Sequence, residues 1–102
     1  LLEKTKNGIR EYKVKETDFA AEKRTVDLNL PTGALILFIK RNNQFIVPDG
    51  GTYFKIGDKA LVVTREKEEI DYAVECFITE NKPEETQEIA NSVNEATESQ
   101  AA

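Results

Sequence analysis

The sequence has no histidine and only one cysteine, Cys76, and these two shortages exclude several kinds of chemistry. Without histidine, the chain cannot form a Ser-His or Cys-His nucleophile, and the usual zinc ligand sets are missing. A single cysteine cannot form a disulfide within the chain, which fits a cytosolic protein. Cys76 adjoins Phe77 in an apolar stripe, so we expect its thiol to pack rather than to react. We therefore predict no catalytic residue, no metal site and no enzymatic activity.

Long apolar runs are also absent. No stretch of about 18 apolar residues is available to span a membrane, and no signal peptide is visible. The 102 residues suffice for one domain and are too few for two. Because the chain starts with Leu1 rather than Met, we expect residues 1–8 to be a lead-in from a longer parent protein.

Negative charge is concentrated toward one end. The net charge of -5 combines a balance of +4 over residues 1–65 with -9 over residues 66–102. The acidic total argues against a general nucleic-acid binder, because phosphate backbones are bound by clustered Lys and Arg. The net positive charge of residues 1–65 is compatible with the binding of a small anionic ligand. Over residues 79–102 large apolar side chains are so few that we expect an acidic, flexible tail, or a helix formed only against a partner.

The hydrophobic pattern predicts four strands, at residues 9–17, 34–41, 44–48 and 59–65. The first strand is polar with weak alternation, which suits a sheet edge. Six consecutive apolar residues from Ala34 to Ile39 suit a central strand that is covered on both faces. Asn42-Asn43 signals a hairpin turn because Asn tolerates positive φ. Pro48 ends the returning strand because it has no N–H to donate.

Two helices are expected beside this sheet. The first runs from about Phe19 to Leu28, with Asp18 as its cap. The second is indicated by an apolar stripe at i, i+3, i+4 and i+7, formed by Ile70, Ala73, Val74 and Phe77. Together these elements predict an α+β domain over residues 9–78, with a mixed or antiparallel sheet of about four strands and two helices. A core of about 70 residues is marginally stable alone, which favours a dimer or a larger parent.

The glycine-rich stretch that follows Phe45 invites a phosphate-loop or a metal-loop interpretation, and the spacing fits neither. A P-loop has four residues between its glycines, then Lys and Ser or Thr at the start of a helix. Here five residues separate Gly51 from Gly57, and a strand follows. Asp49 and Asp58 lack the alternating oxygen ligands of a calcium loop. We interpret the stretch as two tight turns between strands.

A basic strand end is the remaining candidate for a binding site. Lys40 and Arg41 end the apolar strand, opposite Gln44, Phe45 and Ile46 across the hairpin. Basic groups beside apolar side chains and a proline are suited to hold a nucleobase and a phosphate. The alternative is that the two charges only solubilise a strand terminus.

In order and spacing these pieces resemble the RCK C-terminal domain, also called the TrkA-C domain. That family's pattern is a turn, an apolar strand ending in a basic residue, a polar hairpin, a VIxP-like strand, a polar turn with Thr, and Gly-Asp before a third strand and a closing helix. The corresponding pieces here are Gly33, ALILFI, KR, NN, FIVP, DGGT, GD, KALVVT and KEEIDYAVECF. The resemblance covers roughly residues 10–78, and residues 33–64 most specifically.

The resemblance implies a βαβββα-like domain that pairs with a second copy as a homodimer. Such domains regulate potassium channels, potassium uptake systems and cation/proton antiporters from the cytosolic side, and some members bind cyclic di-AMP at the dimer interface. Carried over by position, the ligand-binding residues are Lys40, Arg41, Phe45, Ile46 and Pro48. Phe45 stands where the family more often has a small or aliphatic residue.

The resemblance also leads to an expected parent protein. We expect a potassium/proton antiporter or a related cation transporter, whose integral membrane domain carries this module at the cytoplasmic face of the cell membrane. No cofactor is expected beyond the regulatory nucleotide, cyclic di-AMP.

Two other functions stay open at this point. The domain can serve as a ligand-free structural module that holds a transporter or channel complex together by sheet-edge pairing or by its acidic tail. A nucleic-acid-binding β-domain needs exposed aromatic side chains on a basic face, for which Tyr12, Tyr53 and Phe54 are the candidates. The acidic balance argues against that function, and we predict no nucleic-acid partner.

Overall fold

The computed structural model describes residues 6–82 and is built on one four-stranded antiparallel sheet with the strand order β1-β4-β2-β3. The strands are β1 (Gly8–Lys13), β2 (Ala34–Arg41), β3 (Gln44–Ile46) and β4 (Lys59–Thr64). The helical elements are the 3-10 helices η2 (Thr25–Leu28) and η3 (Lys67–Glu69) and the α-helix α1 (Ile70–Ile78). The predicted α+β class is confirmed, and the sheet is antiparallel throughout.

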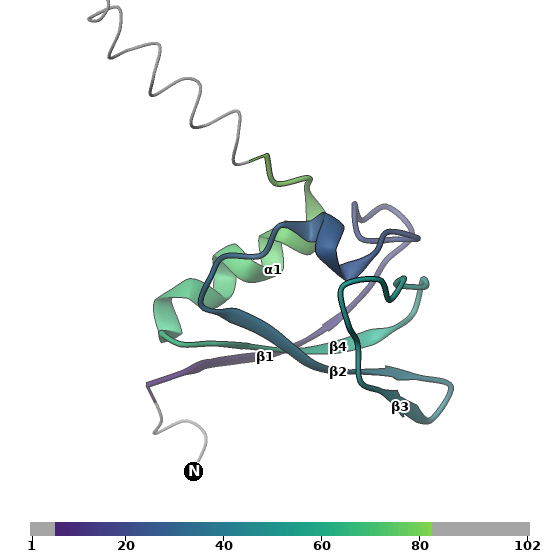
Figure 1. The fold of residues 1–102 in the computed structure, drawn as a ribbon, viewed down its shortest axis with the longest axis horizontal. Coiled ribbons are helices and arrows are strands. Elements are labelled where there is room, and N and C mark those ends of the chain that lie inside the picture. Colours follow the sequence, from purple (N-terminus) through teal and green to yellow (C-terminus); the bar gives the residue numbers. More distant parts are fainter. Residues whose placement is uncertain (1–5, 83–102) are drawn as a thin grey trace, which may run out of the picture.

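Helix α1 and the segment around η2 cover one side of the sheet (Figure 1). The four residues of the predicted apolar stripe, Ile70, Ala73, Val74 and Phe77, are all buried. The ring of Phe77 packs against Tyr12 of β1 and against Phe54, with centroid distances of 5.3 Å in both pairs. The stripe therefore forms the core with the sheet, as its period predicts.

The strands take the places that their patterns predict. The polar strand β1 lies at an edge, and the apolar strands β2 and β4 lie in the middle. Asn42 and Asn43 connect β2 to β3 with φ angles of 51° and 64°. Two successive residues with positive φ are typical of the type I′ hairpin turn, so the turn chemistry is confirmed.

The side of the sheet opposite α1 is not covered by any described residue, and Figure 1 shows it free of helices. We call this side the open face. The pairing registers and burial place these residues on it: Ile9, Glu11, Lys13, Leu35, Phe38, Lys40, Phe45, Lys59, Leu61 and Val63. The expectation that β2 is covered on both faces is therefore wrong within residues 6–82. Leu35 is 57% exposed, because α1 and η2 lie on the same side of the sheet.

An irregularity in β2 controls which side chains reach the open face. The pairing of β2 with β4 shifts between Ile36 and Phe38, so Leu37 is an extra residue with no partner on β4. As in other bulges, the alternation of side chains changes there. Ile36 lies on the covered side before the shift, and Phe38 lies on the open face after it. The bulge residue Leu37 is 43% exposed.

The helix predicted over residues 19–28 does not form, except for the short 3-10 helix η2 at its end. Glu22 has a φ of 65°, which interrupts a right-handed helix. Its N–H donates to the carbonyl oxygen of Phe54 at 3.0 Å, and Arg24 bridges to Tyr53 as in a sheet. Backbone hydrogen bonds to a distant loop thus replace the helical ones, which local propensity cannot anticipate.

Asp18 has a different role from the predicted helix cap. Its Oδ2 atom accepts hydrogen bonds from the Tyr12 hydroxyl at 2.7 Å and from the Lys15 N–H at 2.8 Å. The side chain is buried, and it closes the turn after β1. The lead-in over residues 1–8 and the acidic tail over residues 79–102 lie largely outside the described residues. Within residues 6–82, no helix has the length and apolar character needed to cross a membrane.

Candidate ligand-binding site

The five residues predicted to bind a ligand lie in or next to the β2–β3 hairpin, but the structure places them in four different surroundings. Lys40 and Phe45 are direct partners across the hairpin and share the open face. Arg41 reaches the loop that precedes β4, and Ile46 packs against the core. Pro48 lines a groove beside β2. Only Lys40 and Phe45 are brought together in a way that lets them contact one ligand on the open face.

Phe45 offers an aromatic surface to solvent, since it is 66% exposed. Its ring meets Phe38 edge to face, with a centroid distance of 4.8 Å and an interplanar angle of 72°. The ammonium group of Lys40 lies 6.0 Å from the centroid of the Phe45 ring, at the limit of a cation–π contact. The pair therefore presents a positive charge beside a flat apolar ring, which suits a phosphate and a nucleobase.

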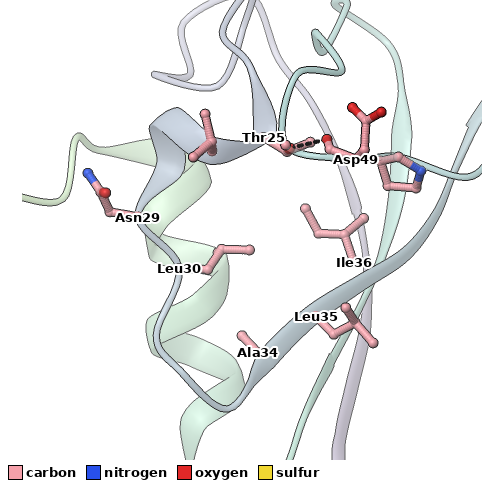
Figure 2. Close-up of a pocket in the computed structure, with 10 residues that line it drawn as sticks. Thr25, Asn29, Leu30, Ala34, Leu35, Ile36 and Asp49 are labelled. Atoms are coloured by element: carbon pink, nitrogen blue, oxygen red, sulfur yellow. Dashed lines mark hydrogen bonds between the residues drawn. The ribbon is translucent and has the colours of Figure 1, made fainter.

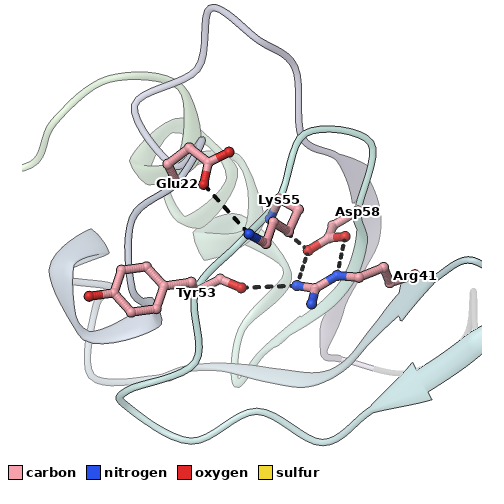
Figure 3. A network of polar contacts seen from close by, with 5 residues as sticks. All are labelled: Glu22, Arg41, Tyr53, Lys55 and Asp58. Atoms are coloured by element: carbon pink, nitrogen blue, oxygen red, sulfur yellow. Dashed lines mark hydrogen bonds and ion pairs between the residues drawn. The ribbon is translucent and has the colours of Figure 1, made fainter.

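Arg41 is occupied mainly within the chain, as Figure 3 shows. Its Nε donates to Asp58 Oδ1 at 2.9 Å, and its Nη2 donates to Asp58 Oδ2 at 2.8 Å. Nη2 also donates to the carbonyl oxygen of Tyr53 at 2.9 Å. The hydrogen bonds to Asp58 raise the pKa of Arg41, so its charge persists at any physiological pH. Among the described residues Nη1 has no hydrogen-bond partner, and it is the part of the guanidinium left for a ligand.

Asp58 is the partner of Arg41, a pairing that the sequence did not predict. It is 1% exposed, and besides Arg41 it accepts a hydrogen bond from the Lys55 N–H at 2.9 Å. The predicted Gly57-Asp58 turn does form, with Gly57 at a φ of 95°. In the sequence Asp58 is marked only by its position between a glycine and an apolar strand. Nothing close to it in the chain indicates that it pairs with Arg41.

A groove of about 450 Å³ runs along the part of β2 that β3 does not pair, between η2 and the turn after β3 (Figure 2). Ile36 points into this groove, and Leu35 belongs to its lining with its side chain directed away from the middle. Thr25 closes one end by donating a hydrogen bond from its hydroxyl to the carbonyl oxygen of Asp49. Pro48 belongs to this groove, so it lies on a different surface from Phe45.

Cys76 is buried in α1, where the predicted packing role is confirmed. Burial raises the pKa of its thiol, and the neighbouring carboxylate of Glu75 raises it further by a smaller amount. Both effects disfavour the reactive thiolate. Within residues 6–82, His, Cys, Asp and Glu side chains nowhere gather in groups of three or more that could hold a metal ion.

Comparisons with known proteins agree on one family. The model of the family described as the TrkA-C domain matches residues 9–72, a range that contains the open face and the β2–β3 hairpin. Among solved structures, a similar chain is described as "Structure of RCK domain with cda". It is 29% identical, the similarity covers 69% of this chain and 97% of that chain, and the TM-score is 0.51. No curated protein matches the sequence.

Proposed function

The chain belongs to the TrkA-C domain family, and from that premise we propose that it is a cytoplasmic regulatory domain of a potassium/proton antiporter or a related cation transporter. Domains of this family are regulatory rather than catalytic, and RCK domains generally dimerise and attach to membrane transporters. In the proposed function this domain forms a homodimer, binds a regulatory nucleotide such as cyclic di-AMP, and so controls ion transport.

The apolar surface of the open face is the observation that carries the proposal. Leu35 and Phe45 are mostly exposed, and Leu61 and Val63 between the edges of the sheet are only half-buried. Contiguous apolar surface of this kind is typical of a contact with another chain. A second copy that packs on the open face removes these side chains from water. A domain of this size gains stability from such a contact because alone it buries a limited share of its surface.

Phe45 and Lys40 supply the two contacts that a nucleotide requires. Stacking of a base on an exposed aromatic ring contributes about 1–3 kcal/mol. The adjacent ammonium group attracts a phosphate through a charge-assisted hydrogen bond. The similar solved domain is described as an RCK domain with cda. Cyclic di-AMP, which the resemblance to the family implies, is the first ligand to test.

Regulation in this proposal follows from a difference in affinity. A ligand that binds one arrangement of the two copies more tightly than another shifts the equilibrium toward the first arrangement. The size of the shift is limited by the ratio of the two affinities, and transport responds only to the extent that the membrane domain distinguishes the arrangements.

Calorimetric titration of the 102-residue chain with cyclic di-AMP tests the ligand, and light scattering after gel filtration tests the dimer. We expect a dimer that binds the nucleotide, with affinity at least about tenfold lower in Phe45→Ala because a stacking contact is lost. Tyr72→Ala is the matched control, since Tyr72 is 52% exposed on α1, away from the open face. A monomer without affinity for the nucleotide contradicts the proposal. A dimer without such affinity supports the ligand-free interaction module instead.

A further inference from the structure

Three lysines form one row across the open face. Lys13 on β1 is the direct partner of Lys59 on β4, and Lys59 is the direct partner of Lys40 on β2. The row continues to Phe45 on β3, the partner of Lys40. Because adjacent strands lie about 4.8 Å apart, the Cα atoms of the three lysines span about 10 Å.

Such a row is unfavourable for folding, because like charges directly opposite each other in a sheet repel. None of the three lysines makes an ion pair with the part of the chain that the structure describes. The acidic side chain nearest in register on this face is Glu11, which is paired with Leu61 rather than with a lysine. Lysine on an edge strand protects against aggregation, but that reason applies to Lys13 alone, since β4 and β2 are inner strands.

A hollow of about 240 Å³ lies at the end of this row. It is lined by Lys40 and Lys59 together with Asn42, Asn43 and Gly57, and no carboxylate is among its lining residues. The side-chain amides of the two asparagines add uncharged donors to the two ammonium groups. A hollow lined by two cations and two amides is complementary to an anion with several acceptor oxygens.

We propose that Lys59, flanked by Lys13 and Lys40, forms a phosphate-binding site on the open face and holds the phosphate groups of the regulatory ligand. This site extends the proposed function, on which it rests for the identity of the ligand. Phe45 takes the base, and the lysine row beside it takes the phosphates. The ligand class is a compound with a flat ring and at least two negative charges, because the row carries three positive charges with one acidic neighbour, Glu11.

The test removes single lysine charges. We expect Lys59→Gln to raise the dissociation constant for cyclic di-AMP about tenfold, and Lys13→Gln to raise it about threefold, because a charge-assisted hydrogen bond is lost. Lys67→Gln is the matched control, because Lys67 is also exposed but follows the opposite end of β4. Lys59→Arg retains the charge and should restore most of the affinity. At low ionic strength Lys59→Gln should also raise the melting temperature of the free protein, because repulsion within the row is relieved.

The outcomes separate this inference from the proposed function. If cyclic di-AMP binds and both lysine variants bind it as tightly as Lys67→Gln does, the phosphate site is refuted while the ligand assignment stands. If cyclic di-AMP does not bind, the ligand assignment fails, and inorganic pyrophosphate tests the site by itself. Changes in the amide NMR signals of Lys13, Lys40 and Lys59 on pyrophosphate addition, lost in Lys59→Gln, then support the site. Their absence overturns it.

Discussion

Replacing Arg41 by methionine distinguishes two possible roles of this residue. Its position in the sequence predicts a contact with the ligand, whereas in the structure it anchors the loop that precedes β4. Methionine keeps the apolar stem and removes the guanidinium. If Arg41 is mainly an anchor, Arg41→Met leaves the carboxylate of Asp58 buried without its two strongest donors. The Lys55 N–H is then its one donor among the described residues.

The magnitude follows from the burial of the two partners. Removing one partner of a buried ion pair costs about 3–5 kcal/mol. The side chain of Arg41 is 29% exposed whereas that of Asp58 is 1% exposed, so the lower end of this range applies. About 3 kcal/mol is a large part of the total for a domain of this size, roughly 4–12 kcal/mol. The corresponding fall in melting temperature is about 12–24 °C.

Thermal unfolding followed by circular dichroism measures this loss, and titration with cyclic di-AMP at a temperature where the variant is folded measures the ligand contact. Arg41→Lys keeps the charge but cannot span both carboxylate oxygens, so an intermediate loss is expected. The double variant Arg41→Met/Asp58→Asn should lose little more stability than the less stable of the two single variants, because the two side chains stabilise the fold as one ion pair. A melting temperature within about 4 °C of the parent, combined with a tenfold loss of affinity, refutes the anchor role and supports the ligand role.

Three further predictions concern packing, pH and assembly. A methyl group at Gly8 overlaps the hydroxyl of Thr64, so Gly8→Ala should lower the free energy of unfolding in urea by about 1–3 kcal/mol. A methyl group at Gly51 meets only Asp49 Oδ1, at an ordinary contact distance of 3.6 Å, so Gly51→Ala should lower it by less than about 0.5 kcal/mol. Burial raises the pKa of Tyr12. The folded state therefore holds that proton more tightly than the unfolded state, and stability should fall as pH rises above about 10 in the parent but less in Tyr12→Phe. Leu35→Asp should yield a monomer by light scattering with an almost unchanged melting temperature at low protein concentration, since this exposed side chain supports assembly rather than the core.

Most of the sheet was predictable because its signals are local. The apolar run of β2, the alternation of β4 and the Asn42-Asn43 turn each depend on residues close together in the sequence. The stripe on α1 is local in the same sense. The segment 19–28 was not predictable in this way, because many of its backbone hydrogen bonds go to residues 50–54 and to the end of α1. A strong tertiary partner overrides a weak helix propensity.

The candidate site was predictable in part. Lys40 and Phe45 were selected for their place at a hairpin, and the structure brings them together on the open face. Arg41 was selected for the same reason, yet its principal partner is Asp58, 17 positions further along the chain. The row of Lys13, Lys59 and Lys40 was not visible at all, because it joins three strands whose order differs from their order in the sequence.

The sequence by itself excluded several kinds of chemistry through its composition. It also determined the strands and turns, the apolar stripe of the closing helix and the family. These depend on residue types at short spacings, which local backbone preferences and hydrophobic periodicity are sufficient to interpret. Only the tertiary structure decided that β1 pairs with β4, that a bulge at Leu37 directs Phe38 to the open face, and that Arg41 binds Asp58. The physical reason is register: a shift of one residue between paired strands moves every side chain to the other face. That pairing is made between residues far apart in the chain.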